Sequence, residues 1–147
     1  MTTELSARTA DIKRIFSSLG TSEARYERLI ELGRKLPSYP ADRKTADRIV
    51  SGCQSTLYLD AEIREGKIFF KADSEALISK GLAALLIGVY NGLSPEALLQ
   101  SPTFLQEIGI FATLSPSRSN GLAHIYLRMK SLALFGVKAR QVAAIHQ

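Results

Sequence analysis

The apolar positions at the start of the chain recur with the period of an α-helix. Four of them follow the spacing i, i+3, i+4, i+7: Ile12, Ile15, Phe16 and Leu19. Gly20 then marks the end of this helix. Thr21 or Ser22 offers an N-cap for a second amphipathic helix, which Pro37 ends. The sequence therefore predicts two consecutive helices, followed by the charged connector ADRKTADR.

The middle of the chain has the period and composition of β-structure, with many β-branched and aromatic residues. The predicted elements are a short strand at Ile49, a turn at Ser51–Gly52, a strand from Thr56 to about Ile63 and a return strand from Ile68 to Lys71. Gly66 lies in the loop REGK between the last two strands and favours a tight hairpin.

Helices return after Asp73–Ser74, a pair suited to an N-cap. The next segment is apolar on nearly every face from Leu82 onward, which indicates a helix at the centre of a domain, and Asn91–Gly92 ends it. A short helix at Ser94–Pro95–Glu96 and a final helix after SPSRSNG complete the chain. Helices flanking a small antiparallel sheet predict an α+β fold, and the length suits a single domain over residues 1–147.

Composition excludes several other classes of protein. With 46% hydrophobic and 22% charged residues, the chain is ordinary for a globular protein. The N-terminus, MTTELSARTADIKR, lacks the apolar core of a secretory signal. The longest apolar run, Leu82 to Tyr90, is shorter than the roughly 20 residues that span a bilayer. A single cysteine cannot form an internal disulfide, so we expect a cytoplasmic protein.

The net charge of +5 is concentrated toward the C-terminus, where residues 101–147 hold five Lys or Arg and only one acid, Glu107. These cations are scattered, with no aromatic residues interleaved as in nucleic-acid-binding surfaces. A solvated helix face is therefore the favoured interpretation, and we expect neither a nucleic acid nor a membrane as partner.

The only cysteine, Cys53, lies in SGCQS at residues 51–55. A lone cysteine is usually a small buried hydrophobe. Its place at a predicted turn, the small Gly52 before it and the polar Gln54 and Ser55 after it favour a reactive thiol instead. Both interpretations stay open at this point.

The chain lacks the partners that most cysteine chemistry needs. His146 is next to the last residue, and His124 falls on the polar side of the final helix, where a surface position is expected. Zinc and iron–sulfur sites need about three or four Cys or His ligands, so we expect no metal site. What remains is chemistry of one thiolate, such as accepting an atom from another protein's thiol.

Arg118 is unusual because it lies at the start of the final helix, where the helix dipole disfavours a cation. Two interpretations are open. Arg118 pairs with a nearby carboxylate, or it lies close to Cys53, where a guanidinium would lower the pKa of the thiol.

Four segments together carry a family resemblance: YERLIELGRKLP, VSGCQS, ADSEALISKGLAALL and LSPSRSNGL. In this order they resemble the SufE family of sulfur-acceptor proteins, from Tyr26 to Ala133, about three quarters of the chain. The resemblance implies an α+β fold similar to that of IscU-type iron–sulfur scaffolds. The scaffold function does not carry over, because it relies on more than one cysteine.

The resemblance implies a relay of persulfide sulfur for iron–sulfur cluster assembly. A SufS-type cysteine desulfurase, with its own pyridoxal phosphate, holds the sulfur as a persulfide. The cysteine matching Cys53 accepts this sulfur, and the protein passes it to a SufBCD-type scaffold. The protein also enhances the activity of the desulfurase. The chain itself needs no cofactor and is an accessory protein more than a stand-alone enzyme. Arg118 would activate the thiolate or dock the partner. The implied binding residues are Gly52, Gln54, Ser55, Asp73 and Glu75.

The sequence departs from the family pattern at Ala72, usually glycine, and at Glu75, often aspartate. Two rival hypotheses remain. One is a regulatory binding module that docks on a desulfurase without carrying sulfur, and the other is a single-cysteine thiol oxidoreductase. A Suf-type pathway and a CsdA–CsdE type relay would look alike in this sequence.

Overall fold

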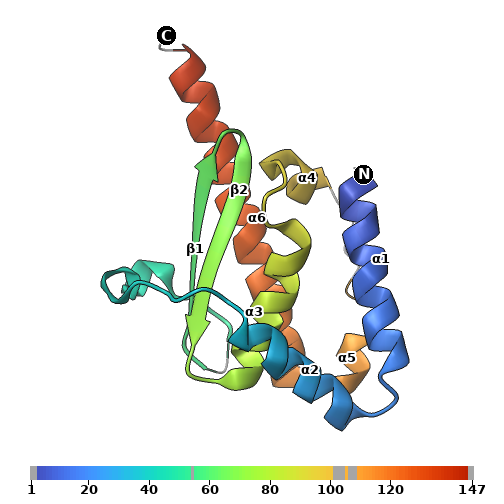
Figure 1. Cartoon of the computed structure of the whole chain (residues 1–147). Coiled ribbons are helices and arrows are strands. Elements are labelled where there is room, and N and C mark those ends of the chain that lie inside the picture. Colours follow the sequence, from blue (N-terminus) through green and yellow to red (C-terminus); the bar gives the residue numbers. More distant parts are fainter. Residues whose placement is uncertain (1–2, 54, 101–104, 106–108, 146–147) are drawn as a thin grey trace.

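The structure is a computed structural model that describes residues 3–53, 55–100, 105 and 109–145. The helices are α1 (Thr3–Ser18), α2 (Ser22–Arg34), α3 (Leu77–Tyr90), α4 (Pro95–Gln100), α5 (Ile110–Thr113) and α6 (Pro116–Ile145), with short 3₁₀-helices η1 (Ala41–Arg43) and η2 (Ala46–Arg48). Strands β1 (Leu57–Arg64) and β2 (Lys67–Ser74) form one antiparallel pair. The predicted α+β class is confirmed, with helices packed against a small sheet (Figure 1).

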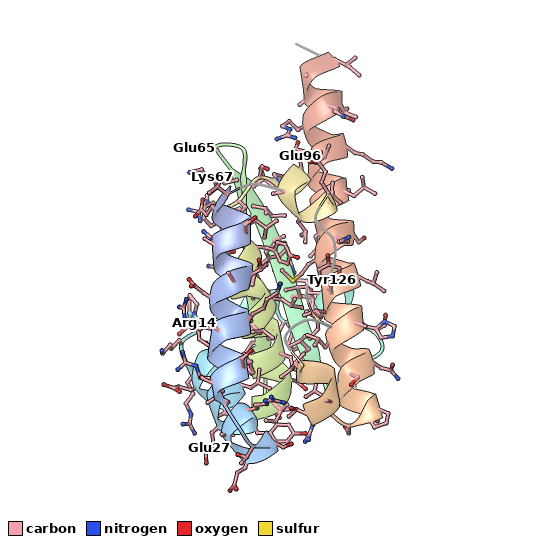
Figure 2. The ribbon with its side chains drawn as sticks, turned by 90° about the vertical axis from the view of Figure 1, so that its right-hand side faces the viewer. Arg14, Glu27, Glu65, Lys67, Glu96 and Tyr126 are labelled. Carbon is pink, nitrogen blue, oxygen red and sulfur yellow. The ribbon has the colours of Figure 1, made fainter. Side chains whose placement is uncertain are left out.

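The hairpin of β1 and β2 follows from its alternating pattern and its turn. Side chains at every second position of β2 are buried: Ile68, Phe70, Ala72 and Ser74. Glu65 and Gly66 form the turn with φ of 52° and 77°, the left-handed values that a tight two-residue hairpin needs. Figure 2 shows Glu65 and Lys67 at this tip, far from the ends of the strands that lead to the cysteine.

α3 forms the centre of the core, as its apolar sequence predicts, and packs against β2, α2 and α6. The crossing with α2 is close because two glycines meet there. A Cβ added at Gly81 would overlap the carbonyl carbon of Leu29 at 2.6 Å, and one at Gly33 would lie 3.0 Å from the Gly81 nitrogen. Small residues therefore bring these two helices together, which places α2 beside the cysteine.

The N-terminal cap of α2 and the end of α3 are held by side chains. Thr21 caps α2, as predicted, because its hydroxyl accepts the N–H of Ala24 at 3.1 Å. At the other end of the core, Arg8 of α1 donates to the carbonyls of Val89 (3.0 Å) and Asn91 (2.7 Å). These bonds satisfy carbonyl groups at the end of α3 that have no partner within the helix.

Four predicted boundaries are wrong. The final helix, predicted to follow SPSRSNG, begins within that segment, since α6 starts at Pro116. β2 continues to Ser74, past the predicted end at Lys71, because the alternation of buried side chains extends that far. The predicted N-cap pair Asp73–Ser74 is thus the end of a strand, and α3 begins after Ala76, which makes no side-chain cap. The predicted strand at Ile49 is a single bridge to Tyr58 that directly follows the 3₁₀-helix η2.

α6 packs against α3, α4 and β1 and then extends past the rest of the molecule (Figure 1). Near the hairpin, a Cβ at Gly136 would overlap the side chain of Ile63, so this glycine lets the helix approach β1. Farther along, Arg140 forms an ion pair with Glu96, which Figure 2 shows beside α6. Among the described residues, no helix combines the length and apolar character needed to cross a membrane.

Candidate functional site

Cys53 lies in the connection between η2 and β1, at the turn that the sequence predicts. The N–H of Val50 donates to the carbonyl of Leu57 at 2.9 Å, which closes the connection at its base. Gly52 has φ of +88°, a value that favours glycine, and turns the chain so that Cys53 faces the helices. The Cys53 side chain is half-buried, so it is not fully enclosed in the core.

The start of α6 lies against this cysteine. Ser115 stabilises the first turn, since its hydroxyl accepts the N–H of Arg118 at 3.3 Å and its carbonyl accepts the N–H of Ser119 at 2.9 Å. Pro116, which follows, suits the first helical position. One turn farther, the carbonyl oxygen of Gly121 lies 3.9 Å from Cys53 Sγ. The segment LSPSRSNG thus forms one wall around the thiol.

Cys53 lines a pocket of about 390 Å³ between α2, α3 and α6. Most of its wall is aliphatic: Ile30, Leu77, Ile78, Leu82 and Ile125. Its polar lining consists of serines and one cation: Ser55, Ser79, Ser117 and Arg118. The structure therefore brings three of the predicted site residues together, namely Cys53, Ser55 and Arg118.

The electrostatics of the thiol are set by burial. Partial burial disfavours the thiolate and raises the pKa of Cys53 above its ordinary value. In this arrangement the thiol is thus mostly protonated at neutral pH, a form that attacks sulfur poorly. The pocket shelters the sulfur atom and does not by itself activate it.

Arg118 is exposed at the rim of the pocket. Its guanidinium carbon lies 5.4 Å from the ring centroid of Tyr26, a cation–π distance, and it forms no ion pair with a carboxylate among the described residues. Tyr26 is itself fixed, because its hydroxyl donates to the carbonyl of Thr113 at 2.8 Å. Tyr26, in the segment YERLIELGRKLP, thus orients Arg118, in the segment LSPSRSNGL.

Two further predicted binding residues lie in a neighbouring polar pocket of about 530 Å³. Asp73 and Glu75 line it, and Ser55 lines both pockets. Asp73 forms ion pairs with Lys44 (3.0 Å) and Lys80 (3.3 Å). Partial burial would raise the pKa of Asp73, but hydrogen bonds from these two ammonium groups outweigh it and lower the pKa. The polar pocket and the mainly aliphatic pocket are adjacent, because Ser55 and Ala76 line both.

Gln54 and the two histidines lie outside both pockets or outside the described residues. Gln54 lies outside the described residues, as does His146. His124 is exposed, as predicted, but its ring packs directly on Gly52, and sequence reasoning missed this contact. No sequence signal pointed to it, because the contact depends on how α6 crosses the segment before Cys53.

Comparison with known proteins identifies the family. The family model SufE, described as an Fe-S metabolism associated domain, matches residues 10–133. The chain belongs to the SufE family. Two SufE-like relatives agree with this assignment. The chain is 39% identical to an uncharacterized SufE-like protein of Synechocystis, over 75% of this chain and 70% of the relative. It is 35% identical to the chloroplastic/mitochondrial SufE-like protein 1 of Arabidopsis thaliana, over 89% of this chain. The match spans 36% of the Arabidopsis relative's length.

A further SufE-family relative has a functional name. The chain is 38% identical to the sulfur acceptor protein CsdE of Escherichia coli, over 76% of this chain and 78% of the relative. The solution structure of a hypothetical protein from Thermus thermophilus has a TM-score of 0.76 at 27% identity, covering 89% of this chain and 96% of that one. Among the described residues, no three His, Cys, Asp or Glu side chains gather into a metal site.

Proposed function

We propose that this chain accepts sulfur on Cys53 from a cysteine desulfurase and carries it toward iron–sulfur cluster assembly. The observation that carries the proposal is the position of the chain's only cysteine, half-buried at a mainly aliphatic pocket in a SufE-family fold. The sulfur-acceptor name of the Escherichia coli relative supports the same role.

The transfer is a displacement at sulfur. The thiolate of Cys53 attacks the terminal sulfur of a persulfide on the desulfurase, forming a new S–S bond. The S–S bond of the donor breaks, and its cysteine leaves as a thiolate that takes up a proton from solvent. The sulfur keeps its oxidation state, so no external oxidant or reductant is needed. We expect no cofactor in this chain, with pyridoxal phosphate confined to the desulfurase.

Two states of the cysteine segment account for both transport and reaction. In the described state, burial raises the pKa of Cys53 and protects the sulfur from reductants. A pocket of about 390 Å³ has room for one more sulfur atom beside the thiol. On the desulfurase, we propose that Cys53 moves outward with Gly52 as the hinge, which restores an ordinary pKa. Arg118, at the rim, then stabilises the thiolate or contacts the partner.

The desulfurase would be of the SufS type, and the chain would enhance its turnover by removing the persulfide. A SufBCD-type scaffold would then receive the sulfur. The polar pocket with Asp73 and Glu75 lies next to the cysteine pocket and shares Ser55 with it, so it is the surface best situated to contact the partner.

A second candidate function is a regulatory module that stimulates a desulfurase without carrying sulfur. The burial of Cys53, which lowers its thiolate fraction, is the observation in its favour. The two functions differ in one experiment, desulfurase turnover with the Cys53→Ser variant. A carrier predicts that stimulation by the variant is lost, whereas a regulatory module predicts that it is retained. Thermal unfolding of the variant controls for its folding.

A further inference from the structure

One face of α6 contacts the whole arm that leads to the cysteine. Gly121, His124 and Arg128 follow the spacing i, i+3, i+7 and therefore lie on the same side of the helix. The arm, residues 47–53, runs past them in the opposite direction. Cys53 lies against Gly121, and Arg128 Nη2 donates to the carbonyl of Asp47 at 2.5 Å. His124 lies between these two contacts.

The second contact joins the ring of His124 to the backbone of Gly52. A Cβ added at Gly52 would lie within 2.6 Å of three ring atoms of His124, so the imidazole rests directly on the backbone of the turn. The same glycine has φ of +88°, and it precedes Cys53. Movement of the arm away from α6 would therefore break this contact.

Within the part of the chain that the structure describes, the side chain of His124 belongs to neither the hydrophobic core nor a metal site. It is exposed and does not belong to the hydrophobic core, which α6 contributes to through the residues next to it, Leu122 and Ile125. It is also no candidate for a metal site, since the described residues hold no cluster of metal ligands.

We propose that His124 is a positioning residue: its ring holds the arm of residues 47–53 against α6 and thereby keeps Cys53 in the pocket. The restraint acts through packing of the flat ring on Gly52. The consequence for sulfur transfer rests on the function proposed above, since a partner that loads Cys53 would have to move Gly52 away from the ring. The restraint itself is a property of the isolated protein.

The test is the rate at which iodoacetamide alkylates Cys53 in the isolated protein at fixed pH, followed by intact-protein mass spectrometry. We expect His124→Ala to raise the rate roughly fivefold, the factor that loss of about 1 kcal/mol gives in an opening equilibrium. His124→Phe, which keeps a flat ring, should stay near the wild-type rate. Leu127→Ala, on an exposed position of the same helix, serves as the matched control and should change nothing.

Wild-type reactivity in His124→Ala would overturn the proposal. So would a His124→Phe variant as reactive as His124→Ala, because a ring of similar size would then not restrain the arm. Acceleration by Leu127→Ala to the same extent would show general loosening of α6 and would also contradict it. No desulfurase is present, so failure here leaves the sulfur-acceptor role untouched, and failure of that role leaves this result standing.

Discussion

In the proposed carrier role, Cys53 would have to meet two opposing requirements at the scale of a single residue. A carrier must protect its sulfur between partners, yet the attack on a persulfide needs a thiolate. The structure meets the first requirement by half-burying the thiol beside aliphatic side chains, which raises its pKa. The second requirement calls for a change of surroundings, and this is why the arm that bears Cys53 matters as much as the thiol.

The first prediction concerns the pH dependence of thiol reactivity. Because burial raises the pKa of Cys53, alkylation of the native protein should reach its half-maximal rate at a higher pH than in concentrated urea, where the pKa returns to about 8.5. Arg118→Gln should leave the native midpoint unchanged, since burial is the cause of the shift. The measurement is the iodoacetamide rate against pH. A native midpoint at or below the unfolded one would mean that Arg118 already governs the thiol.

The second prediction concerns Gly52, with Gly66 as its matched control. Both have positive φ, at +88° and +77°, but only Gly52 has a side chain where its Cβ would lie. Each Gly→Ala change should cost about 1–2 kcal/mol for the left-handed backbone, and Gly52→Ala should cost more through overlap with His124.

Urea unfolding measures both costs. In a His124→Ala background the extra cost of Gly52→Ala should disappear, so that the two glycine variants become alike. An equal cost of Gly52→Ala with and without His124 would mean that the ring does not press on the turn.

Some features of the site residues could be predicted from the sequence. Cys53 at a turn and Gly52 with a positive φ follow from local residue types. The proximity of Arg118 to Cys53 was one of two open interpretations, and the structure lines one pocket with both. The contact of His124 with Gly52 could not be predicted, because it depends on how α6 crosses the arm and not on either segment alone.

At the scale of elements, helices were predicted better than the ends of strands. The turn at Glu65–Gly66 and the cap at Thr21 have local signatures and were predicted. The end of β2 was wrong because Asp73 and Ser74 have the residue types of an N-cap, yet their surroundings decide otherwise. Asp73 is held by Lys44 and Lys80, and the Ser74 hydroxyl donates to the carbonyl of Thr56 at 2.7 Å.

The third prediction tests the crossing of α2 and α3 with two glycines of one helix. Gly81→Ala should destabilise the protein by about 1–3 kcal/mol or more, since the new Cβ would overlap the backbone of Leu29, which cannot move aside like a flexible side chain. Gly88→Ala meets open space and should be neutral or stabilising by up to about 1 kcal/mol, because alanine favours the helix. Urea unfolding compares them. Equal costs would contradict the close crossing at Gly81.

At the scale of the whole molecule, the pocket around Cys53 is assembled from segments far apart in the chain. α2 contributes Ile30, the segment after η2 contributes Cys53, α3 contributes Leu82 and α6 contributes Arg118. The four segments that carry the family resemblance therefore meet around one thiol. The fold class and the family were predictable from these segments, whereas their arrangement around the pocket needed the structure.

The measurement that tests the central claim most directly is intact-protein mass spectrometry after mixing the chain with a SufS-type desulfurase and cysteine, without reductant. We predict a gain of one or more sulfur atoms that maps to Cys53 and is absent in Cys53→Ser. A rise in desulfurase activity with no sulfur on Cys53 would contradict the carrier role and identify the chain as a regulator of its partner.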